Sequence, residues 1–254
     1  MRRPGRGIFA ILERNLRAFR QDWIGTFCWL GAEPLLLLIA VGYGVGTLVG
    51  EVQGRAYLQF FFPALVVGAA MLNAYFEASQ MSASKLFERK VYKAALATPL
   101  PPADIVVGEI FWSTIKAFMS SAFLLFAGLS AGILDPLPAL QLAGFAFATA
   151  LIFSSLGLLV GTWTLSAHGL LAIQSGIILP LFLFSGAFFP VTQVSENLAR
   201  VLEFSPLTLS VRIARAIMYG ELSMEIGFLA LILGLQGFIF FNLSVNRALR
   251  NLFR

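Results

Sequence analysis

Four ionisable side chains lie inside otherwise apolar stretches of the sequence: Glu33, Glu77, Glu109 and Lys116. A charge at the centre of a bilayer costs about 3 kcal/mol, so such groups face protein or water and seek partners. Glu109 and Lys116 are two helical turns apart, too far for a direct pair. Lys116 is therefore expected to meet Glu33 or Glu77 on another helix. The four residues indicate a structural ion pair, a polar lining of a translocation path or a proton site, and the sequence leaves these three open.

A second candidate site is the polar stretch 85–104, KLFERKVYKAALATPLPPAD, which separates two apolar stretches. Lys85, Arg89 and Lys93 recur every four residues and would form one basic stripe on a helix. Prolines 99, 101 and 102 end such a helix near residue 98, and Pro102 suits the first turn of the next one. A short amphipathic helix of this kind predicts either a docking element for a soluble partner or a surface loop on lipid phosphates.

The sequence lacks the motifs that would give the chain a catalytic activity of its own. It has no G-x-x-x-x-G-K-[ST] phosphate-binding loop. His168 is the single histidine, which argues against a His-based metal site and predicts a plain turn residue. Ser185 is not in a G-x-S-x-G context, so a serine hydrolase is not expected. The chain is therefore predicted not to be an enzyme, and to hold no metal and no cofactor.

The composition places the chain in a membrane. It is 58% hydrophobic and 12% charged, whereas soluble domains carry about 25% charged residues. The basic residues form separated clusters between apolar stretches instead of one patch, which indicates membrane topology and no nucleic-acid partner. Cys28 is the single cysteine, so an internal disulfide is excluded. No cleavable signal peptide is expected, because the first apolar stretch is too long and follows a basic amphipathic segment.

Six apolar stretches are long enough to cross a bilayer as helices. They are Trp23–Val49, Tyr57–Met81, Ile105–Leu134, Leu140–Leu165, Leu170–Phe189 and Ile226–Val245. Glu33-Pro34 is expected to interrupt the first span, and Pro180 to kink the fifth. Gly157 and Gly161 predict close helix contact by the fourth span.

The segments that join the spans are short and polar. Asp135–Pro138 and Ser166–Gly169 are expected to form tight turns. Between the fifth and sixth spans, the sequence predicts two short helices that dip into or lie on the membrane face. The first carries an apolar stripe of Val194, Leu198, Val201 and Leu202, and the second begins at Ser205-Pro206 and runs to Gly220.

The distribution of cations predicts the topology. Residues 1–21 form a basic amphipathic helix, with Arg14, Arg17 and Arg20 among its cations, which is expected to lie in the membrane interface. Six spans put both termini on one side. That side would carry 13 of the 18 Lys and Arg residues. By the positive-inside rule, both termini and the central loop are predicted to be cytoplasmic.

Aromatic residues gather near the outer ends of the second and fifth spans. The plain interpretation is packing or lipid contact. The sharper hypothesis is an outer gate formed by Phe188, Phe189 and Pro190, or a surface on which sugar or acyl groups slide.

Four stretches carry a family resemblance: EPLLLLIAVGYGVG from Glu33, KVYKAALATPLPPADIVVGEIFW from Lys90, LFSGAFFPV up to Val191, and SPLTLSVRIAR from Ser205. With them, the chain resembles the membrane subunits of type-2 ABC exporters, most closely the NodJ-like group of nodulation-factor and related lipo-oligosaccharide exporters. The resemblance covers nearly the whole chain. Two departures are that Pro101 stands where family members often have Ser, and Leu209 where they often have His, so any role of that His is absent.

The resemblance implies a six-span subunit that dimerises and pairs with two copies of a separate ABC ATPase, which would bind ATP and Mg²⁺. It implies that the 85–98 segment is a coupling helix in a cleft of the ATPase, with the Arg-rich amino-terminal helix as a second contact. The coupling residues expected from this are Lys85, Phe87, Glu88, Arg89, Lys90, Tyr92 and Lys93. Residues 190–220 would be a re-entrant helix pair near the outer exit.

Together these features predict an all-α membrane protein with one transmembrane domain over residues 1–254. It would have six transmembrane helices, an amino-terminal amphipathic interfacial helix, a cytoplasmic coupling helix and a short re-entrant helix pair before the last span. The expected function is the permease subunit of an ATP-driven exporter of an amphipathic or lipid-linked saccharide in the bacterial cytoplasmic membrane. The alternatives are a drug or other lipid exporter on the same scaffold, an ATP-independent carrier and a membrane-embedded enzyme.

Overall fold

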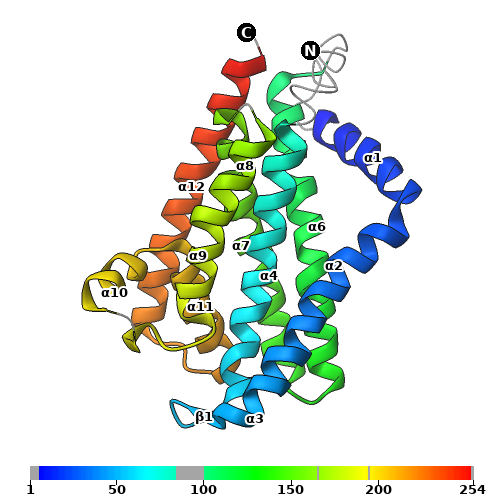
Figure 1. Ribbon diagram of the computed structural model, residues 1–254. Helices are drawn as coiled ribbons and strands as arrows, with labels where there is room; N and C mark the ends of the chain where they lie inside the picture. Colours follow the sequence, from blue (N-terminus) through cyan, green and yellow to red (C-terminus); the bar gives the residue numbers. More distant parts are fainter. Residues whose placement is uncertain (1–5, 84–99, 165, 194, 253–254) are drawn as a thin grey trace.

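The computed structural model describes the chain except for residues 1–5, 84–99, 165, 194 and 253–254. The predicted coupling helix, 85–98, therefore lies outside the described residues. Figure 1 shows a bundle of long, roughly parallel helices with a diagonal helix beside it and a cluster of short helices near one end. Within the described residues, six helical segments are long and apolar enough to cross a membrane.

The six predicted spans are confirmed as helices, with shifted ends. The first span is formed by α2 (Trp23–Leu37), η1 (Leu38–Val45) and α3 (Gly46–Val49), and the second is α4 (Tyr57–Ala83). The third, fourth and sixth are α6 (Pro102–Ser130), α7 (Pro136–Trp163) and α12 (Met224–Leu252). The fifth is built from α8 (Ala167–Ile173), η3 (Gln174–Ile178), α9 (Leu179–Phe182) and η4 (Leu183–Ala187).

The remaining elements are short or lie beside the bundle. Helix α1 (Arg6–Gln21) leads into the first span. Strands β1 (Glu51–Val52) and β2 (Arg55–Ala56) form a small antiparallel hairpin between the first two spans. After the fifth span come a 3-10 turn, η5 (Val191–Gln193), and then α10 (Glu196–Glu203) and α11 (Pro206–Tyr219), which match the predicted helix pair.

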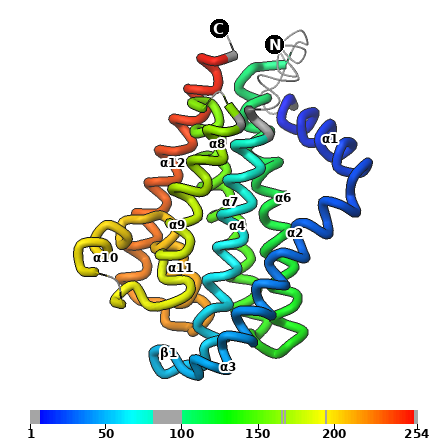
Figure 2. Tube along the Cα trace, viewed as in Figure 1, coloured from blue at the N-terminus to red at the C-terminus, as the bar shows by residue number. Residues whose placement is uncertain are grey.

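The two ends of the bundle are distinct. Helix α1 begins, α4 ends, α6 begins and α12 ends at one end, which we call the terminal end (Figure 2). The β1–β2 hairpin lies at the opposite end, which we call the hairpin end (Figure 1). An even number of crossings places the segments before and after the six spans at the same end, as predicted.

Helix α4 is the centre of the core. Its side chains from Phe60 to Ala70 are buried, and those of Phe61, Phe62 and Val66 are fully enclosed. Two hydroxyl and amide contacts tie it to α6: Ser121 Oγ donates to the Val66 carbonyl at 2.9 Å, and Asn73 Nδ2 donates to Ser120 Oγ at 3.2 Å. Polar contacts of this kind hold membrane helices together where the hydrophobic effect between helices is weak.

The close helix contact predicted for Gly157 and Gly161 is confirmed, and its partner is α4. A Cβ at Gly157 would lie 2.5 Å from the Tyr75 carbonyl oxygen, and one at Gly161 would lie 2.7 Å from that of Ser79. Both neighbours are backbone atoms, so they cannot rotate away from a larger side chain. The two glycines therefore set the distance between α7 and α4.

Two predicted interruptions of the spans are misplaced. The first span passes through Pro34 without a break and widens into π-type turns only from Leu38. In the fifth span, π-type turns precede Pro180, and the backbone leaves the helical region at Gly186, with φ of +85°. Because a positive φ carries little cost only for glycine, the break falls there and not at the proline.

Both predicted tight turns are helix starts. Asp135 has an extended backbone and precedes Pro136 at the first helical position of α7, where its missing N–H is not needed. Ser166 caps α8, because its Oγ accepts a hydrogen bond from the Gly169 N–H at 3.1 Å. Between α6 and α7, the chain reverses before Asp135, at Ala131–Leu134, where Gly132 has a φ of +67°.

Substituting Gly157 by Ala should destabilise the protein, because the new Cβ meets the α4 backbone. Overpacking of this kind costs about 1–3 kcal/mol. The matched control is Gly144→Ala on the same helix, where a Cβ has nothing within 4 Å. Thermal unfolding in detergent should show a lower midpoint for the Gly157 variant only; equal midpoints for both would contradict the packing described.

Candidate functional site

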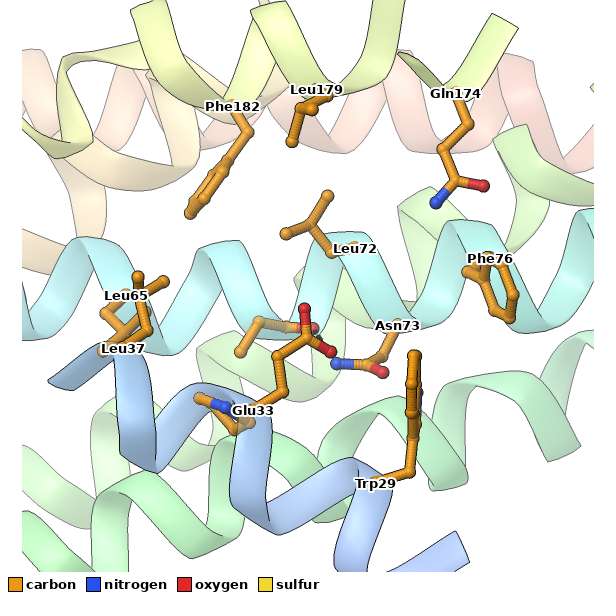
Figure 3. Close-up of a pocket in the computed structure, with 12 residues that line it drawn as sticks. Trp29, Glu33, Leu37, Leu65, Leu72, Asn73, Phe76, Gln174, Leu179 and Phe182 are labelled. Carbon is orange, nitrogen blue, oxygen red and sulfur yellow. Dashed lines mark hydrogen bonds between the residues drawn. The ribbon is translucent and has the colours of Figure 1, made fainter. Parts of the chain in front are cut away.

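A groove with a few polar side chains in a mostly apolar lining runs along α4. Helix α4 forms its floor, α2 forms one wall, and the fifth span forms the other (Figure 3). The hollow shown there has a volume of about 250 Å³. Its lining residues differ in polarity: Leu65, Leu72 and Leu179 are apolar, whereas Glu33, Asn73 and Gln174 are polar.

A second hollow adjoins the first and extends toward the start of α2. It has a volume of about 350 Å³, and the two share Trp29, Asn73 and Phe76 as lining residues. Its further polar residues are Asp22, Thr26, Glu77 and Lys116. The two hollows therefore form one groove with acidic, basic and amide groups along an otherwise apolar surface.

The ion pair expected for Lys116 is confirmed, with Glu77 as the partner. The Nζ atom of Lys116 on α6 lies 2.8 Å from Oε2 of Glu77 on α4, and both side chains are more than four-fifths buried. The pair bridges two helices and lines the groove at once. It therefore fits the structural ion pair among the interpretations that the sequence left open.

Glu33 is the carboxylate that stays available inside the groove. Its side chain projects from α2 toward α4 (Figure 3) and is exposed in the isolated chain. Among the described residues, it has no hydrogen bond or ion pair. Asn73, across the groove, already donates to Ala69 O and Ser120 Oγ. The acid of Glu33 is thus free to meet a ligand, water or a second chain.

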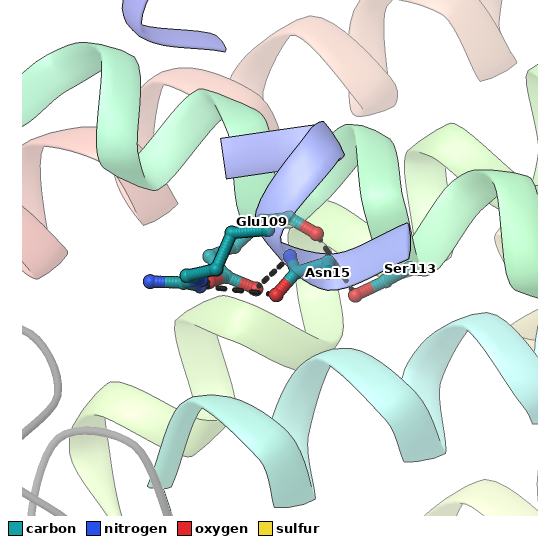
Figure 4. A network of polar contacts seen from close by, with 4 residues as sticks. Asn15, Glu109 and Ser113 are labelled. Carbon is teal, nitrogen blue, oxygen red and sulfur yellow. Dashed lines mark hydrogen bonds and ion pairs between the residues drawn. The ribbon is translucent and has the colours of Figure 1, made fainter. Parts of the chain in front are cut away.

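Glu109 is not part of the groove. Its carboxylate, 4% exposed, accepts hydrogen bonds from Arg14, which also forms an ion pair with it, and from Asn15 Nδ2 at 3.2 Å (Figure 4). Arg14 also donates to Asn15 Oδ1 at 3.0 Å. This network joins α1 to α6, and the sequence reasoning missed it because it treated the arginines of residues 1–21 as surface charges.

Helix α1 is fixed to α6 by three further contacts. The Gly7 N–H donates to Asp104 Oδ2 at 3.1 Å, so a carboxylate of α6 caps the start of α1. Ile11 packs onto Gly108, where a Cβ would lie 2.8 Å from it. Phe19 and Trp112 meet edge to face at 6.1 Å. Helix α1 is therefore packed against the first three turns of α6.

The other two predicted arginines of α1 point outward. Arg17 forms an exposed pair with Glu13 at 2.6 Å, and Arg20 is exposed without an ion pair among the described residues. Exposed pairs of this kind contribute about 0–1 kcal/mol. Arg17 and Arg20 thus remain available for contacts outside the chain.

Aromatic residues at the hairpin end form a cluster around Phe188 and a separate pair, Phe184 and Phe189. Phe188 packs against Phe61 at 5.4 Å and against Phe182 at 5.3 Å between ring centroids, and its carbonyl accepts a hydrogen bond from the Tyr57 hydroxyl at 3.1 Å. Phe182 in turn lines the groove. Phe189 packs against Phe184 at 6.1 Å, and Pro190 is buried. The cluster around Phe188 therefore reaches from the groove to the hairpin end.

Arg215 joins three elements there, and sequence analysis gave it no role. Its guanidinium donates to the carbonyls of Gly186 at 2.6 Å and Phe60 at 3.1 Å, and it lies 3.6 Å from the centre of the Phe60 ring. A cation at the carbonyl end of the fifth span opposes the negative end of the helix dipole. Burial lowers the pKa of Arg215 to about 10, so it stays charged at neutral pH.

These features define the class: a multi-pass α-helical membrane protein with a partly polar groove between its first, second and fifth spans. Residues 6–219 match the ABC-2 type transporter family, and the chain belongs to this family. The comparison confirms the resemblance predicted from the sequence motifs.

The relatives support the same assignment. The chain is 32% identical to Nodulation protein J of Rhizobium leguminosarum bv. trifolii, over 84% of this chain and 81% of the relative. It is 29% identical to Nodulation protein J of Sinorhizobium fredii, over 82% and 80% respectively. It is 24% identical to the inner membrane transport permease YadH of Escherichia coli, over 72% and 71%.

Removing one partner of the Glu77–Lys116 pair should cost more than removing both. Lys116→Met leaves a buried, uncompensated carboxylate, which costs about 3–5 kcal/mol. The double variant Glu77→Gln/Lys116→Met should recover at least half of the loss in thermal midpoint. The exposed pair Glu196–Arg200, at 2.6 Å, is the control, and the same substitutions there should change little. A double variant no more stable than the single one would contradict this account.

Proposed function

We propose that the chain is the membrane subunit of an ATP-driven exporter that moves an amphipathic or lipid-linked saccharide across the cytoplasmic membrane. The observation that carries the proposal is the groove along α4, which lies at membrane depth in a member of the ABC-2 type transporter family. Its polar groups suit hydroxyl groups, and its leucine and phenylalanine residues suit an acyl chain.

The groove supports this substrate class better than a purely apolar one. A plain lipid tail has no groups that donate or accept hydrogen bonds, whereas the groove offers both donors and acceptors. They are supplied by Glu33, Asn73, Gln174 and the Glu77–Lys116 pair. The match to proteins named Nodulation protein J points in the same direction. The segment Phe188, Phe189 and Pro190 would close the outer end of the path.

ATP hydrolysis would belong to a separate subunit. The sequence has no phosphate-binding loop, so we assign ATP and Mg²⁺ to two copies of a partner ABC ATPase that act on two copies of this chain. The terminal end would be cytoplasmic, because 13 of the 18 Lys and Arg residues belong, by sequence, to the amino-terminal, central and carboxyl-terminal segments that the predicted topology assigns to the cytoplasm. There the 85–98 segment would act as the coupling helix, and the outward arginines of α1 as a second contact.

The packing of α1 on α6 suggests how movement would spread. A push on the coupling segment reaches the start of α6, which directly follows it in the sequence. Because Arg14, Asn15 and Gly7 hold α1 to Glu109 and Asp104, α1 would move with α6 and carry the first span, which forms one wall of the groove. Closure of the ATPases would in this way change the width of the groove.

Reversing two charges of the coupling segment should uncouple the subunits. The wild-type chain should co-purify with its ATPase from mild detergent, and the eluate should hydrolyse ATP. Arg89→Glu/Lys93→Glu should lose the ATPase or its coupling to transport, because the basic stripe becomes acidic. Arg200→Glu, at an exposed position on α10, is the control and should leave the complex intact. A charge-reversed variant with full ATPase coupling, or a wild-type chain that purifies without any ATPase, would overturn the proposal.

A further inference from the structure

A third hollow opens at the hairpin end, separate from the groove. It has a volume of about 500 Å³ and lies between α11, the start of α12, the segment after the fifth span and the β1–β2 hairpin. Ten of its sixteen lining residues are polar or charged. None of the residues that line the groove lines this hollow, so it is a distinct site.

This hollow is lined by both cationic and anionic side chains, and only some of them have a partner among the described residues. Arg212 and Glu225 both line it, and neither makes an ion pair among the described residues. Glu221 is engaged by Arg55 at 2.5 Å, and Arg215 by backbone carbonyls. A surface with both a free cation and a free carboxylate favours a neutral ligand with many hydroxyl groups over a simple anion.

A buried hydroxyl without a partner belongs to a residue in the wall of the same hollow. Thr208 on α11 lines it and is 1% exposed, and its Oγ1 has no hydrogen-bond partner among the described residues. A buried, unsatisfied hydroxyl costs about 1–3 kcal/mol, and a hydrogen bond from Oγ1 to a ligand or a water would remove this cost. Gln53, Thr192 and Ser223 surround the hollow with further neutral donors and acceptors.

We propose that this hollow binds the sugar part of a saccharide at the extracytoplasmic end of the protein. Hydroxyl groups of a sugar both donate and accept hydrogen bonds, as the arginine, carboxylate, amide and hydroxyl groups of the hollow require. The assignment of the hairpin end to the extracytoplasmic side rests on the proposed function. The site would bind the glycan as it leaves the outer end of the path. Each subunit would have one such site.

Binding is measured on the purified full chain with soluble tetrasaccharides, namely cello-, chito- and maltotetraose. Saturation-transfer NMR detects weak binding of this kind, and a detergent without a sugar headgroup avoids competition. At least one tetrasaccharide should bind to the wild-type chain. Arg212→Gln should weaken binding about tenfold, as expected for a hydrogen bond to a charged group. Arg200→Gln, which removes an exposed cation of α10 outside the hollow, should bind as the wild type does.

Variants of Thr208 distinguish a contact with the ligand from a purely structural role of this residue. Thr208→Val should weaken binding about threefold to tenfold, yet leave the thermal midpoint unchanged or raised, because it removes an unsatisfied hydroxyl. Thr208→Ser keeps the hydroxyl and should retain binding. Loss of binding only together with a lowered midpoint would overturn the assignment of Thr208 as a contact.

Two other results would overturn the site itself. One is that no tetrasaccharide binds, while the wild-type chain still exports with its ATPase; the exporter would then stand without this site. The other is that inorganic phosphate binds through Arg212 and the sugars do not, which would define an anion site. Conversely, sugar binding that depends on Arg212 and Thr208 in a chain with no ATPase partner would support the site and refute the proposed function.

Discussion

The cost of placing charge at membrane depth decides how the helices of this chain meet. Two carboxylates of the spans form ion pairs with cations on other helices: Glu77 pairs with Lys116, and Glu109 pairs with Arg14. The first pair ties α4 to α6, and the second ties α1 to α6. Since breaking either pair would leave an uncompensated charge in a low-dielectric region, the relative positions of α1, α4 and α6 depend on them.

The same cost of burying charge explains two properties of the groove, its fixed floor and its unpaired carboxylate. Helix α4 is held on one side by α6 and on another by the glycines of α7, so it forms a rigid floor. The first span leaves this floor partly uncovered, and Glu33 projects into the opening. A carboxylate that meets no cation among the described residues is unusual at this depth, and it is the clearest sign that the groove accommodates something else.

Much of the fold followed from the sequence because membrane spans are governed by length and apolar composition. The six spans, the start of α6 at Pro102, the close contact of Gly157 and Gly161 and the two short helices at 190–220 were predicted. The misplaced breaks at Pro34, Pro180, Asp135–Pro138 and Ser166–Gly169 share a cause. Proline and serine were taken as interruptions, whereas proline at a first helical position and serine as a cap begin helices, and long membrane helices absorb proline by widening.

The site was harder to predict, because pairing depends on which helix faces which. Spacing along one helix showed that Lys116 needed a partner elsewhere, but Glu33 and Glu77 were equally good candidates. The spacing of residues gave no sign that Arg14 pairs with Glu109, 95 positions away. It also gave no sign that Arg215 donates hydrogen bonds to three backbone carbonyls. The one signal that could have been followed is that a buried carboxylate at Glu109 needs a cation, and Arg14 is among the few that a neighbouring helix could offer.

The central claim is that the groove around Glu33 is the export path, and transport by a Glu33→Gln variant tests it most directly. The chain and its ATPase would be reconstituted in vesicles, with ATP-dependent movement of a fluorescent acylated oligosaccharide as the measurement. The account predicts that Glu33→Gln lowers transport severalfold while the thermal midpoint and complex formation stay unchanged, and that Glu203→Gln, on exposed α10, has no effect. Transport by Glu33→Gln at the wild-type rate would contradict the account.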